Sequence, residues 1–351
     1  MKILCYSSFS FSYLNRARVL FASLKRFHPD WRLVALMTDA VPHGMRFDVA
    51  EEPFDEVVWQ DGLGIAGLPG WLFQHDVVEV CTAVKGPYLD MACRMGFDAV
   101  VYLDPDTCLF NALDPLVALL ETHEIVLTPH ILQPEREDMA IRDNEICPMW
   151  AGIFNLGFVA IRTHGEGARF ARWWAERLLK YCHDDPAKGL FVDQKWCDHV
   201  PVFFDHVHIL KDPGYNVASW NVNQRRITMG ADGEVLANGA PLRFWHFTKL
   251  GPLGDTMTQR YARDQIVVYE LWRWYRAQVA AATSPQVPER YWAFGQFADG
   301  TPIPREARLL YRDRADLQAA FPDPFGAEFA GWLRAQGHLP AGSATSLAHA
   351  A

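Results

Sequence analysis

The sequence has no long apolar run, no long basic run and no CxxC pair. No stretch approaches the ~20 apolar residues of a membrane-spanning helix, so we expect no membrane span. The net charge of −9 without a basic run argues against a nucleic-acid partner. The seven cysteines are scattered and odd in number, which predicts a reduced, cytoplasmic chain. The opening MKILCYSSFSF lacks the apolar core of a signal peptide.

The composition is that of an ordinary globular protein. Half of the residues are hydrophobic and 21% are charged. The length of 351 residues is enough for one large or two small domains with a sizeable core. The chain has thirteen tryptophans and eleven tyrosines. Composition favours core packing as their role, and the alternative is contact with sugars or a membrane surface.

Strand-like and helix-like segments alternate along the chain. Helical spacing of Leu14, Ala17, Leu20, Leu24 and Phe27 predicts a helix over 13–27. Further helices are expected at 74–95, with a break at Gly86-Pro87, and at 166–182, 264–282 and 326–336. Short apolar runs predict strands at 2–7, 33–38, 56–59, 97–103, 124–128, 153–161, 202–210 and 242–247. This order predicts an α/β fold with a mainly parallel sheet flanked by helices.

Three segments are expected to be irregular. The glycine-rich stretch 60–70 and the polar stretch 133–149 are interpreted as loops. The segment 284–351 is rich in proline, glycine and aromatic residues, and its last twelve residues are expected to be disordered. We therefore divide the chain into a main domain (1–258), a packing helix (259–283) and a C-terminal extension (284–351).

Two carboxylates follow the apolar strand in VVYLDPDTCLF. Asp104 and Asp106 are two residues apart, so in an extended segment both side chains point to the same side. Ligands of open parallel sheets collect beyond the carboxyl ends of the strands, and Mg²⁺ or Mn²⁺ prefers such oxygen ligands. The alternative is a simple turn, since Asp-Pro-Asp-Thr is good turn sequence.

A second alternative is a phosphatase of the haloacid-dehalogenase type. Those enzymes place DxDxT after a hydrophobic strand, with the first aspartate, here Asp104, as the nucleophile. Their motif opens the domain, whereas a hundred α/β residues precede it here, and the adjacent pair Asp184-Asp185 follows a predicted helix rather than a strand. His206 and His208 alternate on one strand face, but no further ligands complete a zinc set, and we interpret them as structural.

Seven segments follow one another along the chain: SLKRFHP, TAVKGPYL, YLDPDT, NLGFVAI, the DQ pair at 193–194, YNVASWN and WHF. In this order they resemble the nucleotide-sugar glycosyltransferases of the GT-A fold, most closely family 8 and bacterial members that build surface polysaccharides. The resemblance covers about residues 1–255 and implies that 1–258 is a catalytic domain.

The resemblance implies a metal site and a donor site. Asp104, Asp106 and His246 would bind Mn²⁺ or Mg²⁺; the alternative for His246 is a core histidine whose hydrogen bonds are satisfied within the protein. Lys85 would contact phosphate, and its alternative is a solvated helix lysine. The residues expected around the nucleotide are Ser7, Ser8, Phe9, Tyr13 and Asp39; Asp39 could equally be a strand-end turn.

The remaining candidates lie along the sugar. Asn155 and Gly157 interrupt an apolar strand, where a buried amide needs partners and a glycine permits close approach. By resemblance Asp193 and Gln194 are the catalytic pair, although Asp193 could also be a helix N-cap. Asn216 and Trp220 would contact the donor. Lys249 comes earlier than the family's phosphate-binding lysine.

The implied function is metal-dependent transfer of a sugar from a nucleotide-diphosphate sugar, with a UDP-sugar expected, to a glycan or lipid-linked acceptor with retention of configuration. Inversion with Asp193 as base stays open. A non-catalytic sugar-nucleotide-binding module is a third hypothesis. The extension 284–351 would wrap the catalytic domain, bind acceptor, dock another glycosyltransferase or contact the inner membrane surface.

Overall fold

A seven-stranded sheet forms the centre of the computed structural model, which describes residues 1–340; the tail expected to be disordered lies almost wholly outside the described residues. The strand order is β10-β6-β7-β4-β1-β2-β3. The strands are β1 (Ile3–Phe9), β2 (Arg32–Met37), β3 (Glu56–Trp59), β4 (Ala99–Leu103), β6 (Ile125–Pro129), β7 (Phe154–Arg162) and β10 (Val207–Ile209). Only β7 runs antiparallel to its neighbours in this sheet. The predicted α/β class with a mainly parallel sheet is confirmed.

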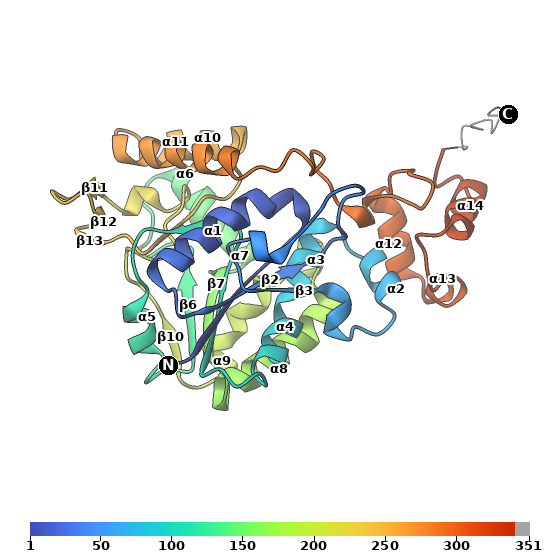
Figure 1. Ribbon diagram of the computed structural model, residues 1–351, viewed down its shortest axis with the longest axis horizontal. Helices are drawn as coiled ribbons and strands as arrows, with labels where there is room; N and C mark the ends of the chain where they lie inside the picture. Colours follow the sequence, from blue (N-terminus) through green and yellow to red (C-terminus); the bar gives the residue numbers. More distant parts are fainter. Residues whose placement is uncertain (341–351) are drawn as a thin grey trace.

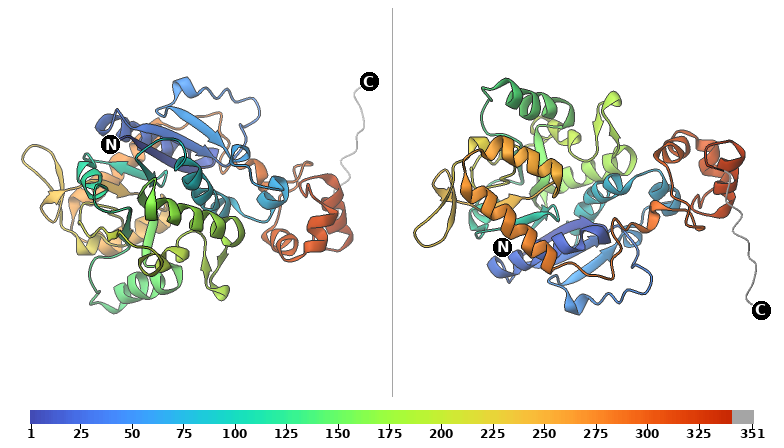
Figure 2. Two further views of the ribbon diagram at one scale, coloured as in Figure 1. Left: turned by 90° about the horizontal axis from the view of Figure 1, so that it is seen from below. Right: turned by 90° about the horizontal axis from the view of Figure 1, so that it is seen from above.

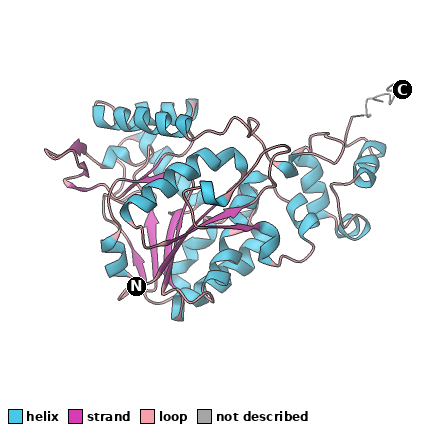
Figure 3. Ribbon diagram, in the orientation of Figure 1, coloured by secondary structure: helices cyan, strands magenta, loops and turns pink. Residues whose placement is uncertain are grey.

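Helices cover both faces of the sheet (Figures 1 and 3). Side chains alternate along β1, so Ile3 and Cys5 face one core cluster while Leu4 and Tyr6 face another. The first cluster is covered by α1 (Leu14–Phe27) and α5 (Asp114–Leu119). The second is covered by α3 (Val77–Ala83), α4 (Lys85–Ala92) and α8 (Gly165–Tyr181).

Smaller sheets flank the central one. The strand β5 (Thr107–Leu109) follows the DPD turn and pairs antiparallel with β14 (Phe244–His246), with Thr107 opposite His246. This pairing brings a residue from late in the chain next to the turn after β4. The other small strands are β8 (Asp184–Asp185), β9 (Leu190–Phe191), β11 (Ile227–Met229), β12 (Val235–Ala237) and β13 (Ala240–Pro241).

Two helices pack behind β14. They are α10 (Pro252–Ala262) and α11 (Ile266–Ala281). The rings of Phe247 and Tyr275 stack with centroids 3.9 Å apart, and Trp272 is buried while Trp274 is exposed. No helix within residues 1–340 is both long enough and apolar enough to cross a membrane. All seven cysteines are free.

The C-terminal extension forms a separate small core at one end of the molecule (Figures 1 and 2). It contains α12 (Arg305–Asp313), α13 (Ala315–Ala320) and α14 (Ala327–Ala335), which pack with α2 (Leu68–Phe73). Phe73 sits in its centre, with the ring of Tyr311 at 5.2 Å and that of Phe329 at 5.4 Å. The extension is therefore anchored to the main domain through the segment before α3.

Several expectations differ from the structure. The predicted loop 60–70 contains a 3₁₀ turn (Gln60–Leu63) and the start of α2. The predicted loop 133–149 contains α6 (Asp138–Ala140), a π-helical turn (Ile141–Ile146) and α7 (Cys147–Ala151), held by hydrogen bonds such as Asn144 Nδ2 to Glu135 Oε1 at 3.0 Å. The predicted strand 202–210 begins as α9 (Val200–Phe203) and only then becomes β10. The helix break falls at Val84, because Pro87 lies in the first turn of α4, where its missing N–H costs little.

Candidate active site

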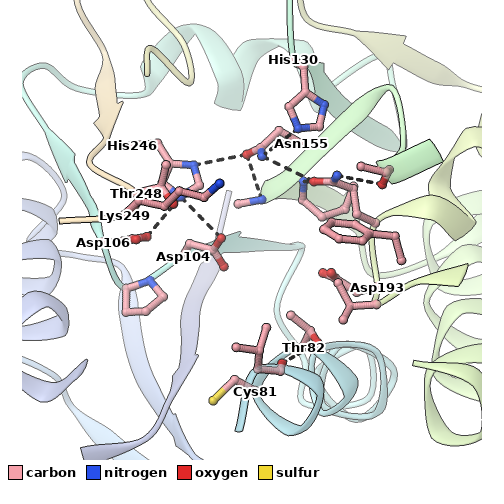
Figure 4. A pocket seen from close by; sticks show the side chains of 18 of the residues that line it. Cys81, Thr82, Asp104, Asp106, His130, Asn155, Asp193, His246, Thr248 and Lys249 are labelled. Atoms are coloured by element: carbon pink, nitrogen blue, oxygen red, sulfur yellow. Dashed lines mark hydrogen bonds and ion pairs between the residues drawn. The ribbon is translucent and has the colours of Figure 1, made fainter. Parts of the chain in front are cut away.

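A cavity of about 480 Å³ opens at the carboxyl ends of β1 and β4. Parts of β7, α3, β14 and the helical segment 138–151 complete its walls (Figure 4). Most residues proposed from the sequence line it. They are Ser8, Phe9, Tyr13, Lys85, Asp104, Asp106, Asn155, Gly157, Asp193, Gln194, Trp220, His246 and Lys249.

The two carboxylates lie in a turn that closes over itself. Thr107 donates from its backbone N–H (3.0 Å) and its hydroxyl (2.8 Å) to the carbonyl oxygen of Asp104. The turn interpretation of DPDT and the site interpretation are thus compatible. Because β5 then pairs with β14, His246 Nε2 lies 3.1 Å from Asp106 Oδ1 and 3.6 Å from Asp104 Oδ2.

Asn155 and Gly157 fix the orientation of His246 (Figure 4). The imidazole Nδ1–H donates to Asn155 Oδ1 at 3.2 Å, which leaves Nε2 facing the carboxylates. A Cβ on Gly157 would lie 2.4 Å from His246 Cε1, so only glycine leaves room for the ring. Asn216 lies behind, outside the cavity lining, and donates to the same Asn155 oxygen at 3.0 Å.

The residues present fit a divalent cation. One atom from each of Asp104, Asp106 and His246 lies within 4.8 Å of the other two, and two carboxylates with one imidazole suit Mn²⁺ or Mg²⁺. Burial alone would lower the pKa of His246, but Asp106 and Asp104 raise it above its ordinary value. Burial would raise the pKa of Asp106, and His246 outweighs this and lowers it.

Lys85 is buried between two acidic side chains. Its ammonium group lies 3.0 Å from Asp104 Oδ1, 2.9 Å from Asp193 Oδ2 and 3.0 Å from the Leu156 carbonyl. Burial would lower the pKa of Lys85, but the carboxylates of Asp104 and Asp193 outweigh this and raise it. The solvated-lysine interpretation is wrong, since Lys85 is 2% exposed.

Gln194 of the DQ pair links two segments that line the cavity, α7 and β7. Gln194 Nε2 donates to the Ala151 carbonyl at 2.9 Å, and its Oε1 faces the backbone N–H of Leu156 at 3.4 Å. Asp193 is not an N-cap: the following 3₁₀ turn begins at Lys195 with Gln194 before it. The Asp193 carboxylate instead pairs with Lys85.

Two residues proposed for the nucleotide end lie outside the cavity lining. Ser7 is fully buried in β1. The Asp39 carboxylate accepts from three backbone N–H groups: Phe11 at 3.0 Å, Ala40 at 2.9 Å and Ala293 at 2.7 Å. Burial raises the pKa of Asp39 to about 6 despite these bonds. The carboxylate that was expected to contact a base or ribose thus accepts a hydrogen bond from the C-terminal extension, through Ala293.

No protein-family model matches the chain. Two uncharacterised proteins of Bacillus subtilis (strain 168) are similar to part of it. YfnF is 31% identical over 184 residues, which is 50% of this chain and 57% of YfnF. YfnD is 29% identical over 174 residues, which is 48% of this chain and 53% of YfnD. The chain thus spans just over half the length of these curated relatives.

Solved glycosyltransferase structures align with most of the chain. The galactosyltransferase LgtC, in complex with donor and acceptor sugar analogues, has a TM-score of 0.44 and 16% identity, covering 82% of this chain and 98% of LgtC. Apo GlyE of Streptococcus pneumoniae TIGR4 has a TM-score of 0.41 and 15% identity, covering 80% of this chain and 64% of GlyE. Values this low assign neither a family nor an activity to this chain.

Sequence reasoning missed several cavity residues. Tyr102 donates its hydroxyl to Asp104 Oδ1 at 2.6 Å, and its ring lies 4.3 Å from the Lys85 ammonium. The i, i+2 spacing before Asp104 is a signal that would have found it. His130, next to Asn155 at 3.3 Å, follows directly after β6. Trp150 directly follows the segment 133–149 that was interpreted as a loop, and it lies in α7.

The other acidic and histidine pairs lie elsewhere. Asp184 and Asp185 form β8 and do not line the cavity, so they do not supply the second acidic pair that the phosphatase alternative requires. His208 packs on His123 with ring centroids 4.6 Å apart, in agreement with a structural role.

Proposed function

We propose that this chain is a metal-dependent glycosyltransferase that moves a sugar from a nucleotide-diphosphate sugar to a glycan or lipid-linked acceptor. The observation that carries the proposal is the Asp104–Asp106–His246 cluster, which opens into the same cavity as the Lys85–Asp193 pair. A cavity of about 480 Å³ falls within the ~300–1,000 Å³ usual for small-molecule sites.

In this proposal Asp104, Asp106 and His246 hold Mn²⁺ or Mg²⁺. A bound divalent cation supplies positive charge against the diphosphate that leaves with the nucleotide. Lys85 then has a role other than the direct phosphate contact that the resemblance implies. Its charge is already taken by Asp104 and Asp193, so it holds both carboxylates in position at the base of the cavity.

The sugar would lie against Asp193 and Gln194, and the nucleotide against Ser8, Phe9 and Tyr13. Tyr13 is 37% exposed with the Arg16 guanidinium 4.1 Å from its ring centroid, whereas Phe9 is 1% exposed. Lys249 lines the cavity in a left-handed conformation, with φ of 57°. UDP is the proposed leaving group, and retention is the proposed stereochemical course.

The acceptor site and the cellular setting are also proposals. We assign the acceptor to the side of the cavity lined by Trp150 and Phe191, whose rings meet edge to face at 5.2 Å. The proposed location is the cytoplasm, with contact to the inner membrane or a second glycosyltransferase through residues 284–340.

The test is turnover of a panel of nucleotide sugars with Mn²⁺. We expect one donor to be hydrolysed or transferred, activity to stop in chelator, and Asp106→Asn and His246→Ala to lose turnover while remaining folded. Asp30→Asn, at an exposed position between α1 and β2, is the matched control. Full activity in chelator would overturn the metal assignment.

Two further outcomes would replace the proposal. Release of phosphate from a phosphomonoester, with an aspartyl-phosphate trapped at Asp104, would make the chain a phosphatase. Donor binding by calorimetry without hydrolysis or transfer would make it a binding module. A β-linked product from an α-linked donor, observed by NMR, would end the proposal of retention only.

A further inference from the structure

A second cavity of about 480 Å³ lies where the C-terminal extension meets the main domain. Gln60 and α2 form one wall, and residues 293–298 with 323 and 325 form the other. The two cavities have no lining residue in common. Nothing in the proposed transfer reaction uses this second cavity, so a ligand bound there is independent of the proposed function.

The floor of this cavity holds an unpaired polar group. Gln60 is 7% exposed, and its Oε1 is buried with no hydrogen-bond partner in residues 1–340. Leaving such an oxygen unpaired costs ~1–3 kcal/mol, and buried polar groups of this kind are normally satisfied. The oxygen has almost no accessible surface in this structure, so a donor on a ligand satisfies it only once the Gln60 amide turns toward the cavity.

The walls and rim supply complementary chemistry. The rings of Phe294 and Phe325, both partly exposed, lie with centroids 5.7 Å apart at 52°, and Phe297 is buried. At the rim, the side chains of Asp323 and Gln296 are exposed. The site thus combines apolar rings with oxygen acceptors.

We propose that this cavity binds a neutral saccharide. A pyranose presents C–H groups on its faces, which pack on aromatic rings, and hydroxyl groups, which donate to oxygens such as Gln60 Oε1 and the Asp323 carboxylate. The lining contains no lysine, arginine or histidine within residues 1–340, so a phosphate-bearing ligand would face Asp323 without a compensating charge. A purely apolar chain would leave the Gln60 oxygen unpaired.

The test is saturation-transfer NMR on the full chain with maltose, cellobiose and lactose as probes. At least one is expected to bind, and Gln60→Met and Asp323→Ala should each weaken its affinity about tenfold, equivalent to ~1.4 kcal/mol. Gln278→Met, on the exposed side of α11, is the matched control and should bind as the wild type does. Thermal unfolding of each variant checks that the fold is kept.

Three outcomes would overturn the proposal. The first is that none of the three sugars binds at millimolar concentration. The second is that dodecanol or glucose 6-phosphate binds in their place. The third is that sugar binding survives in Gln60→Met and Asp323→Ala but is lost in Trp150→Ala, because Trp150 lines the first cavity.

Discussion

Lys85 and Asp193 form an ion pair of 2.9 Å in which the side chains are only 3% and 4% exposed. Neither charge is solvated, and a second carboxylate, Asp104, lies 3.0 Å from the same ammonium group. One buried cation therefore holds together α4, the end of β4 and the DQ segment.

Removing this cation is expected to destabilise the fold. Lys85→Met should lower the free energy of unfolding by ~3–5 kcal/mol, because it leaves buried carboxylates without a partner. Urea denaturation measures the effect. Arg273→Met, which breaks the exposed pair with Glu270, should cost less than ~1 kcal/mol. Equal stability of Lys85→Met and the wild type would contradict this account.

A methyl group at Gly157 should displace His246. Its Cβ would meet His246 Cε1 at 2.4 Å and Asn155 Oδ1 at 2.8 Å, so we expect Gly157→Ala to weaken Mn²⁺ binding by ~10–100-fold, as loss of an orienting partner does. Calorimetric titration measures the affinity. In Gly331→Ala, within α14, the new Cβ meets nothing within 4 Å, so this control should bind Mn²⁺ like the wild type. Unchanged affinity in both variants would argue against the metal site.

Asp39 should make stability depend on pH. Its pKa is raised to about 6 in the folded chain, against ~3.9 in an unfolded one. The folded state therefore binds more protons between these values, so the contribution of Asp39 to stability is full below about pH 4 and is lost as the pH rises through about 6. From about pH 4 to pH 7, the unfolding free energy of Asp39→Asn should rise by ~2–3 kcal/mol relative to the wild type. A flat difference across this range, in paired urea titrations, would show that Asp39 keeps an ordinary pKa.

The C-terminal extension should stabilise a wall of the first cavity. Arg312 pairs with Glu79 of α3 at 2.6 Å, with the side chains 11% and 1% exposed, and Glu79 also accepts the Asp184 backbone N–H at 2.9 Å. Arg312→Ala should cost ~3–5 kcal/mol and increase amide exchange in α3. Arg314→Ala, which breaks an exposed pair with Asp316, is the control. If amide exchange in α3 is unaltered in both variants, the extension does not stabilise this wall of the cavity.

Local patterns were enough to predict most strands and helices and the position of the two carboxylates, Asp104 and Asp106. Helical and strand periodicities are properties of neighbouring residues, and β4 ends where its apolar run ends. The i, i+2 rule placed Asp104 and Asp106 on one side, and the resemblance supplied His246.

What the sequence did not reveal depends on distant partners. Lys85 has the sequence context of a surface helix lysine, and it is buried only because Asp104 and Asp193 come from other elements. Asp39 was expected to face a ligand, but its carboxylate accepts a hydrogen bond from the backbone N–H of Ala293, which is 254 residues away in the sequence. The polar segment 133–149 is partly helical and its side chains pair with distant residues, as when the Tyr261 hydroxyl donates to Asp143 at 2.7 Å.

The hydrogen bond from Ala293 to Asp39 also sets an order of events during synthesis. At about 5–20 residues per second, the ribosome makes Asp39 on the order of ten seconds or more before Ala293. The Trp292 indole, which donates to the Thr38 carbonyl at 3.2 Å, arrives equally late. The carboxyl end of β2 is therefore completed only after residue 293 has been made, and until then Asp39 lacks one of its three backbone donors.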